Sequence, residues 1–83
     1  MTQDQKHEAE LIDVEARIRA CEKLVVEQRA RLTWLRARRL DTGLSLQLLG
    51  QLKFSLELLI STRDLIRHEM EDDKAPRGHF ASH

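Results

Sequence analysis

Aromatic residues, glycine and proline are scarce in this chain. Only 4% of its 83 residues are aromatic, and it has three glycines and one proline. Sheet-based folds draw on aromatic and β-branched strands joined by turns rich in glycine and proline, so this composition argues against a sandwich, a barrel or a sheet-based enzyme. The length allows one small domain. We therefore expect an all-α fold.

Cysteine and long apolar runs are scarce as well. Cys21 is the only cysteine, which excludes an internal disulfide and cannot complete a zinc site alone. We expect no metal, no cofactor and a reducing, cytoplasmic location. No stretch reaches the roughly 20 apolar residues of a membrane span, and the charged first residues are unlike a signal peptide, so no membrane association is expected.

Apolar residues recur at three-and-four spacing along two runs, which is typical of amphipathic helices that pair as a coiled coil. The short connection predicts an antiparallel hairpin over residues 6–73. Asp41 or Thr42 is expected to accept hydrogen bonds from the free amides that open the second helix. The expected segments are a flexible N-terminus at 1–5, helix one at 6–40, the turn at 41–43, helix two at 44–72 and a disordered tail at 74–83.

The heptad pattern predicts which side chains form the seam between the helices. In helix one they are Leu11, Val14, Ile18, Cys21, Val25, Gln28, Leu32, Leu35, Arg39 and Thr42. In helix two they are Leu49, Leu52, Leu56, Leu59, Arg63, Ile66 and Met70. A fold about Asp41 and Thr42 predicts that Ile18 faces Ile66, Cys21 faces Arg63 and Gln28 faces Leu56.

Many large apolar residues remain outside this seam. Exposed together, they would form a patch larger than soluble monomers usually tolerate. We expect a second copy to cover them, giving a homodimeric four-helix bundle. The expected interface residues are Leu48, Phe54, Leu58, Ile60, Leu65 and Trp34.

Charges are balanced in number but ordered along the chain. Fourteen Lys and Arg residues match fourteen Asp and Glu residues. Five arginines fall near the turn without an acid among them: Arg29, Arg31, Arg36, Arg38 and Arg39. Acidic residues gather at both chain ends, so an antiparallel dimer would place each basic tip near its partner's acidic end. The alternative is that the arginines bind phosphate, a nucleic-acid backbone or an acidic protein.

Catalytic motifs are weak. His68 and Glu69 lack the second histidine of a metal-binding HExxH, and the chain has no glycine-rich phosphate loop and no nucleophile paired with a base. We therefore expect no enzymatic activity.

Residues 22–70 resemble a group of short, uncharacterised bacterial helical-hairpin proteins. The matching residues are Glu22, Val25, Gln28, Arg29, Arg31, Leu32, Leu35, Asp41, Thr42, Leu48, Leu49, Arg63, Asp64, Ile66, Glu69 and Met70. The resemblance implies a hairpin fold and brings no activity. Arg39 stands where the group has a glycine, which predicts that helix one continues toward Asp41.

These observations predict a non-enzymatic, homo-oligomeric helical module that acts in interaction or regulation through a protein partner. The alternative is a nucleic-acid-associated accessory protein that uses the arginine-rich tip, with binding expected to be weak or none because the net charge is zero.

Overall fold

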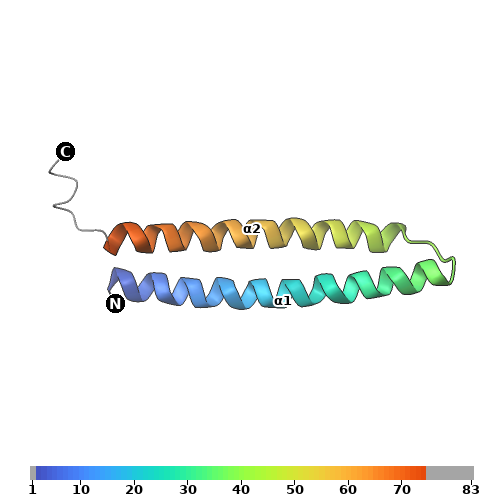
Figure 1. The fold of residues 1–83 in the computed structure, drawn as a ribbon, viewed down its shortest axis with the longest axis horizontal. Helices are drawn as coiled ribbons and strands as arrows, with labels where there is room; N and C mark the ends of the chain where they lie inside the picture. Colours follow the sequence, from blue (N-terminus) through green and yellow to red (C-terminus); the bar gives the residue numbers. More distant parts are fainter. Residues whose placement is uncertain (1, 75–83) are drawn as a thin grey trace.

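The chain folds as an all-helical antiparallel hairpin (Figure 1). The computed structural model describes residues 2–74, and within them there is no strand. Helix α1 (Gln3–Ala37) and helix α2 (Gly43–Lys74) lie side by side. The start of α1 and the end of α2 lie together opposite the turn, and we call this end of the hairpin the open end. The tail was expected at 74–83; Lys74 is the last residue of α2, and residues 75–83 lie outside the described residues.

Helix α1 begins three residues before the expected start, because Thr2 forms a capping box. The Thr2 hydroxyl accepts from the Gln5 amide at 3.2 Å, and the Gln5 side chain accepts from the Thr2 amide at 3.0 Å. These two bonds satisfy amides that a helix N-terminus leaves without partners. The residues from Gln3 onward are therefore helical, where the sequence predicted a flexible N-terminus at 1–5.

Helix α1 also ends three residues before the expected end. The Arg39 amide donates to the Arg36 carbonyl at 3.1 Å, and the Leu40 amide donates to the Leu35 carbonyl at 2.9 Å. This pair of bonds is a Schellman motif, which needs a residue in the left-handed conformation just after the helix. Arg39 takes that conformation, with φ of 57°. The expectation that arginine here would let the helix run on toward Asp41 is wrong.

Replacing Arg39 with glycine should stabilise the hairpin by about 1 kcal/mol, because glycine adopts positive φ without the Cβ clash that arginine meets. Urea unfolding followed by circular dichroism would measure the change. Arg36→Gly is the matched control, since it places glycine inside the last helical turn and should cost about 1 kcal/mol. A loss of stability in both variants would contradict the strain assigned to Arg39.

Asp41 prepares the start of α2. Its Oδ1 accepts from the Gly43 amide at 2.9 Å, and the Leu46 amide donates to the Thr42 carbonyl at 2.9 Å. The expected capping role of Asp41 is confirmed. The turn is thus closed at both ends by local hydrogen bonds, and these fix where the two helices begin to run together.

The seam contains the side chains that the heptad pattern predicted. On α1 it buries Val14, Ile18, Cys21, Val25, Gln28 and Leu32. On α2 it buries Ile66 and half-buries Leu49, Leu52, Leu56, Leu59, Arg63 and Met70. Arg39 is exposed, since α1 ends before it. The best-covered cluster, built on Val14, Ile18 and Ile66, lies in the half of the hairpin near the open end.

The pairing of the two helices differs from the expected one, because two observed contacts lie 11 residues nearer the turn on α2 than predicted. Gln28 was expected to face Leu56, but its Nε2 lies 3.4 Å from the Ser45 carbonyl oxygen. Cys21 was expected to face Arg63, but its Sγ lies 3.4 Å from the Leu52 carbonyl oxygen. Ser45 and Leu52 belong to the same heptad stripe as Leu56 and Arg63, so the shift keeps the same stripes facing each other. The early end of α1 moves the fold-back point toward the N-terminus and selects this register.

Two buried polar residues were not predicted. His7 is buried, with its Nε2 3.5 Å from Glu69 Oε2, and Ser45 is buried beside Gln28. Both continue the heptad by one step, His7 seven residues before Val14 and Ser45 four before Leu49. The seam is therefore longer in both directions than its apolar members indicate.

Candidate interaction surfaces

Large apolar side chains stay exposed on both helices although the seam is filled. Eleven of them are exposed: Ile12, Leu24, Val26, Trp34, Leu40, Leu44, Leu46, Leu48, Phe54, Leu58 and Leu65. Their exposed fractions run from 44% at Leu48 to 83% at Leu44. Apolar surface left exposed on this scale usually marks an interaction site.

The hairpin has two lateral faces, one on each side of the seam. On the first, which we call the Leu24 face, heptad position places six of the exposed apolar side chains. They are Leu24, Trp34, Leu44, Leu48, Leu58 and Leu65. Its grooves run between Arg31 and Leu48 near the turn, and between Arg17 and Thr62 near the open end, with volumes of about 270 and 350 Å³.

The opposite side, which we call the Val26 face, carries Val26, Leu46 and Ile60. Its groove, of about 320 Å³, is lined by charges of both signs beside the apolar residues. The lining residues are Glu22, Val25, Val26, Arg29, Lys53, Leu56, Glu57 and Ile60. Farther along this face, Arg67 Nη2 binds Glu15 Oε2 at 2.8 Å. The Val26 face is thus partly closed by its own ion pairs.

By their heptad positions, four of the six expected interface residues lie on one lateral face. Those on the Leu24 face are Leu48, Leu58, Leu65 and Trp34. Phe54 projects from the outer surface of α2, and Ile60 is half-buried against the core cluster and lines the groove on the Val26 face. Leu24 also lies on the face of those four residues, although it was not among the expected interface residues. Its heptad position directly beside the seam could have identified it from the sequence.

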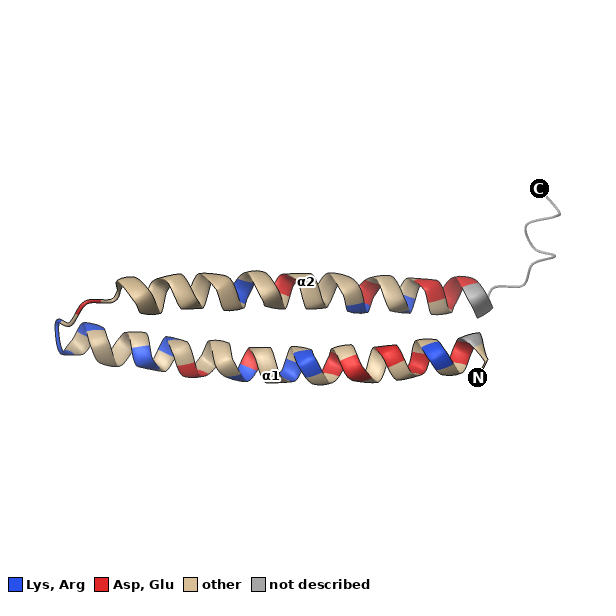
Figure 2. Ribbon diagram, turned by 180° about the vertical axis from the view of Figure 1, so that it is seen from behind, with Lys and Arg blue, Asp and Glu red and all other residues tan. Residues whose placement is uncertain are grey.

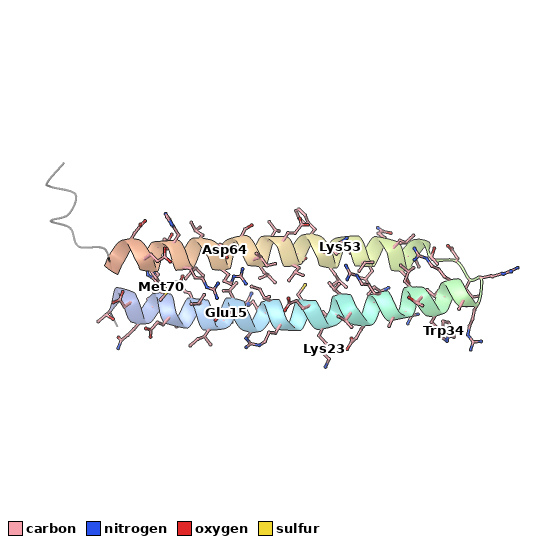
Figure 3. All side chains as sticks on the ribbon, in the orientation of Figure 1. Glu15, Lys23, Trp34, Lys53, Asp64 and Met70 are labelled. Carbon is pink, nitrogen blue, oxygen red and sulfur yellow. The ribbon has the colours of Figure 1, made fainter. Side chains whose placement is uncertain are left out.

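The five arginines near the turn do not form one patch. Arg29 lines the groove of the Val26 face, whereas Arg31 lines a groove of the Leu24 face. Arg36 follows Arg29 by seven residues, and Arg38 follows Arg31 by seven, so each pair lies on one edge of α1. The Arg38 guanidinium lies 4.5 Å from the centre of the Trp34 ring, a cation–π contact. Figure 3 shows Trp34 near the turn, on the side of α1 away from α2.

Charge is polarised along the rod (Figure 2). Basic side chains follow α1 toward the turn, acidic side chains gather toward the open end, and the half of α2 nearest the turn carries few charges. Nearer the middle of α1, Arg17 binds Asp13 at 3.1 Å. The order of charges predicted from the sequence is therefore preserved in space.

The middle of the seam holds one thiol and one half-buried cation. Cys21 is buried and not bonded to another cysteine. Arg63 turns its guanidinium to its neighbour Asp64, with Nη2 and Oδ1 3.0 Å apart, rather than into the seam. Cys21 therefore does not pair with Arg63 as expected and lies against the Leu52 carbonyl instead.

Comparisons with known proteins add no relative. The chain matches no family model, no curated protein and no solved structure. Within residues 2–74, no group of three His, Cys, Asp or Glu side chains is placed to hold a metal ion, and neither helix combines the length and apolar character needed to cross a membrane. The resemblance to bacterial helical-hairpin proteins stays a prediction.

Proposed function

We propose that this protein is a non-enzymatic helical interaction module, which binds a protein partner through its exposed apolar side chains and serves an assembly or regulatory role. One observation carries the proposal: eleven large apolar side chains are exposed although the hairpin has already filled its own seam. Covering a side chain of this size contributes roughly 1.5 to 3 kcal/mol. Its free, buried Cys21 suits a reducing cytoplasm.

A photo-activated cross-linking residue in place of Leu58 tests this proposal in cells. We expect it to form covalent adducts with protein, because Leu58 lies within the exposed apolar surface. The same residue in place of Lys23, which points away from α2 (Figure 3), is the matched control and should form few adducts. Equal labelling at both positions, or none at Leu58, would contradict the proposal.

The alternative function, nucleic-acid binding through the arginine-rich tip, rests on the closeness of Arg36, Arg38 and Arg39 in the sequence and on the stacking of Arg38 on Trp34. We expect this binding to be weak and sensitive to salt, because the arginines are divided between two faces and Arg38 is already stacked on Trp34. If nucleic acid were the partner, log affinity would fall with log salt by about 0.9 per phosphate contacted.

Replacing Arg36, Arg38 and Arg39 together with alanine should then flatten that salt slope, measured by fluorescence anisotropy with a labelled duplex. Replacing Arg17, Arg19 and Lys23 with alanine removes the same charge from the other half of α1 and serves as the control. Tight binding at physiological salt, lost only in the first variant, would favour the alternative over the interaction module.

A further inference from the structure

The Leu24 face changes in character along the rod. From the open end to the turn it presents acidic, apolar and basic side chains in that order. The residues that define these zones are Glu10 and Glu69, then Leu58 and Leu24, then Arg31 and Arg38. Such an order is complementary to itself when one copy is reversed, because the acidic end of one then meets the basic end of the other.

The Val26 face offers less apolar surface: of its three apolar side chains, Val26 and Leu46 are exposed and Ile60 is half-buried. Its groove is lined by the acids Glu22 and Glu57 and by the bases Arg29 and Lys53. Arg67 and Glu15 are joined at 2.8 Å across the seam on this side. Charges that are already paired within one chain gain little from a partner. The Leu24 face, which exposes six large apolar side chains, is therefore the face that a second copy would cover with the larger gain.

We propose that a second copy of this chain covers the Leu24 face, with its rod running in the opposite direction. This inference rests on the proposed function and names its partner. A stable interface takes about 800 Å² from each protein, about one-eighth of the 6667 Å² surface of this chain. A strip along one lateral face of a rod about 50 Å long supplies that area.

The two-fold axis crosses the rods at their middle, where Ala20 of α1 lies level with Leu58 of α2. The symmetry stacks α1 on α1 and α2 on α2, each pair antiparallel, and brings the two copies of Leu58 together. The methyl side chain of Ala20 leaves room for the helices to approach. Within each copy, the charge of Arg17 near this centre is already matched by Asp13 at 3.1 Å.

The same axis matches the charged ends. Arg31 and Glu10 lie on one edge of α1, 11 and 10 residues from Ala20, which is about 16 Å along the helix in each direction. Arg31 of one copy therefore faces Glu10 of the other, and the symmetry repeats this contact. A parallel pair would place Arg31 and Arg38 of both copies at one end, where like charges repel.

Sedimentation equilibrium on paired variants tests which face is used. The wild-type chain should sediment at twice its mass of 9.7 kDa at micromolar concentration. Leu58→Asp with Leu65→Asp should give monomers, whereas Val26→Asp with Leu46→Asp, which changes two exposed side chains on the other face, should remain dimeric. A monomeric wild type, or dissociation only by the second pair, would overturn the inference.

A charge exchange keeps the inference testable if the aspartate pair also unfolds the chain. Arg31→Glu alone and Glu10→Arg alone should each weaken the dimer about tenfold at low salt, since each change affects two symmetric contacts. The double variant Arg31→Glu with Glu10→Arg should restore the wild-type affinity. Weakening that the double variant does not reverse would count against the reversed packing.

Spin labels give the direction of packing. A label on Thr42→Cys in a Cys21→Ser background should report a distance of about 50 Å between the two turns, close to the length of the rod. Labels within about 20 Å would overturn the antiparallel arrangement. If the wild-type chain is monomeric but the cross-linker at Leu58 captures another protein, the proposed function stands and only this inference fails.

Discussion

Replacing Ile18 with alanine should lower the free energy of unfolding by about 2–4 kcal/mol, because the change removes a buried side chain and leaves a cavity. Ile18 is 6% exposed and belongs to the cluster with Val14 and Ile66, the best-covered part of the seam. A hairpin of this size has a small core, so the loss would be a large part of its total stability. Urea unfolding at a fixed protein concentration measures it.

Ile12→Ala is the matched control for this prediction. It makes the same chemical change on the same helix, but Ile12 is 67% exposed. Its loss should stay within about 0.5 kcal/mol. Equal losses in the two variants would mean that the seam described here does not hold the hairpin together.

The identity of the seam could be predicted from the sequence, but its register could not. A heptad stripe faces its partner equally well after a shift of seven residues, so periodicity alone leaves several pairings open. The turn decides between them. The turn depends on Arg39 taking positive φ, a conformation that arginine rarely adopts and that no propensity would assign to it.

The exposed apolar residues could also be predicted, but not their division into faces. Hydrophobicity selected Ile60 together with Leu58 and Leu65, although Ile60 lies on the other side of the seam and packs against the core. The heptad positions distinguish the two sides of the seam. Ile60 precedes the seam residue Arg63 by three, whereas Leu58 precedes the seam residue Leu59 by one. The same edge positions separate Arg29 from Arg31. The Leu24 face is defined by two properties of each side chain together, its exposure and its position on one edge of the heptad.

Gln28→Glu should destabilise the hairpin by about 2–3 kcal/mol at neutral pH. The Gln28 side chain is 8% exposed, and its amide nitrogen donates to the Ser45 carbonyl oxygen at 3.4 Å. A carboxylate has no proton to donate and would set a buried negative charge against that carbonyl dipole. Arg31, which lines the same groove, would offset part of this cost, but an exposed pair contributes only about 0–1 kcal/mol.

The loss of stability in the Gln28→Glu variant should become smaller as the pH falls. Burial and the nearby carbonyl favour the protonated carboxyl in the folded state, so the folded variant binds more protons than the unfolded one. Its free energy of unfolding should therefore rise relative to wild type as the pH falls toward about 4, where the protonated group can donate to Ser45. Gln51→Glu, the same change at an exposed position of α2, is the control and should stay near wild-type stability at both pH values. Urea titrations of both variants at pH 7 and pH 4 measure these differences. Equal stability of the two variants at pH 7 would show that Gln28 does not donate across the seam. The observed register would then lose its main polar contact.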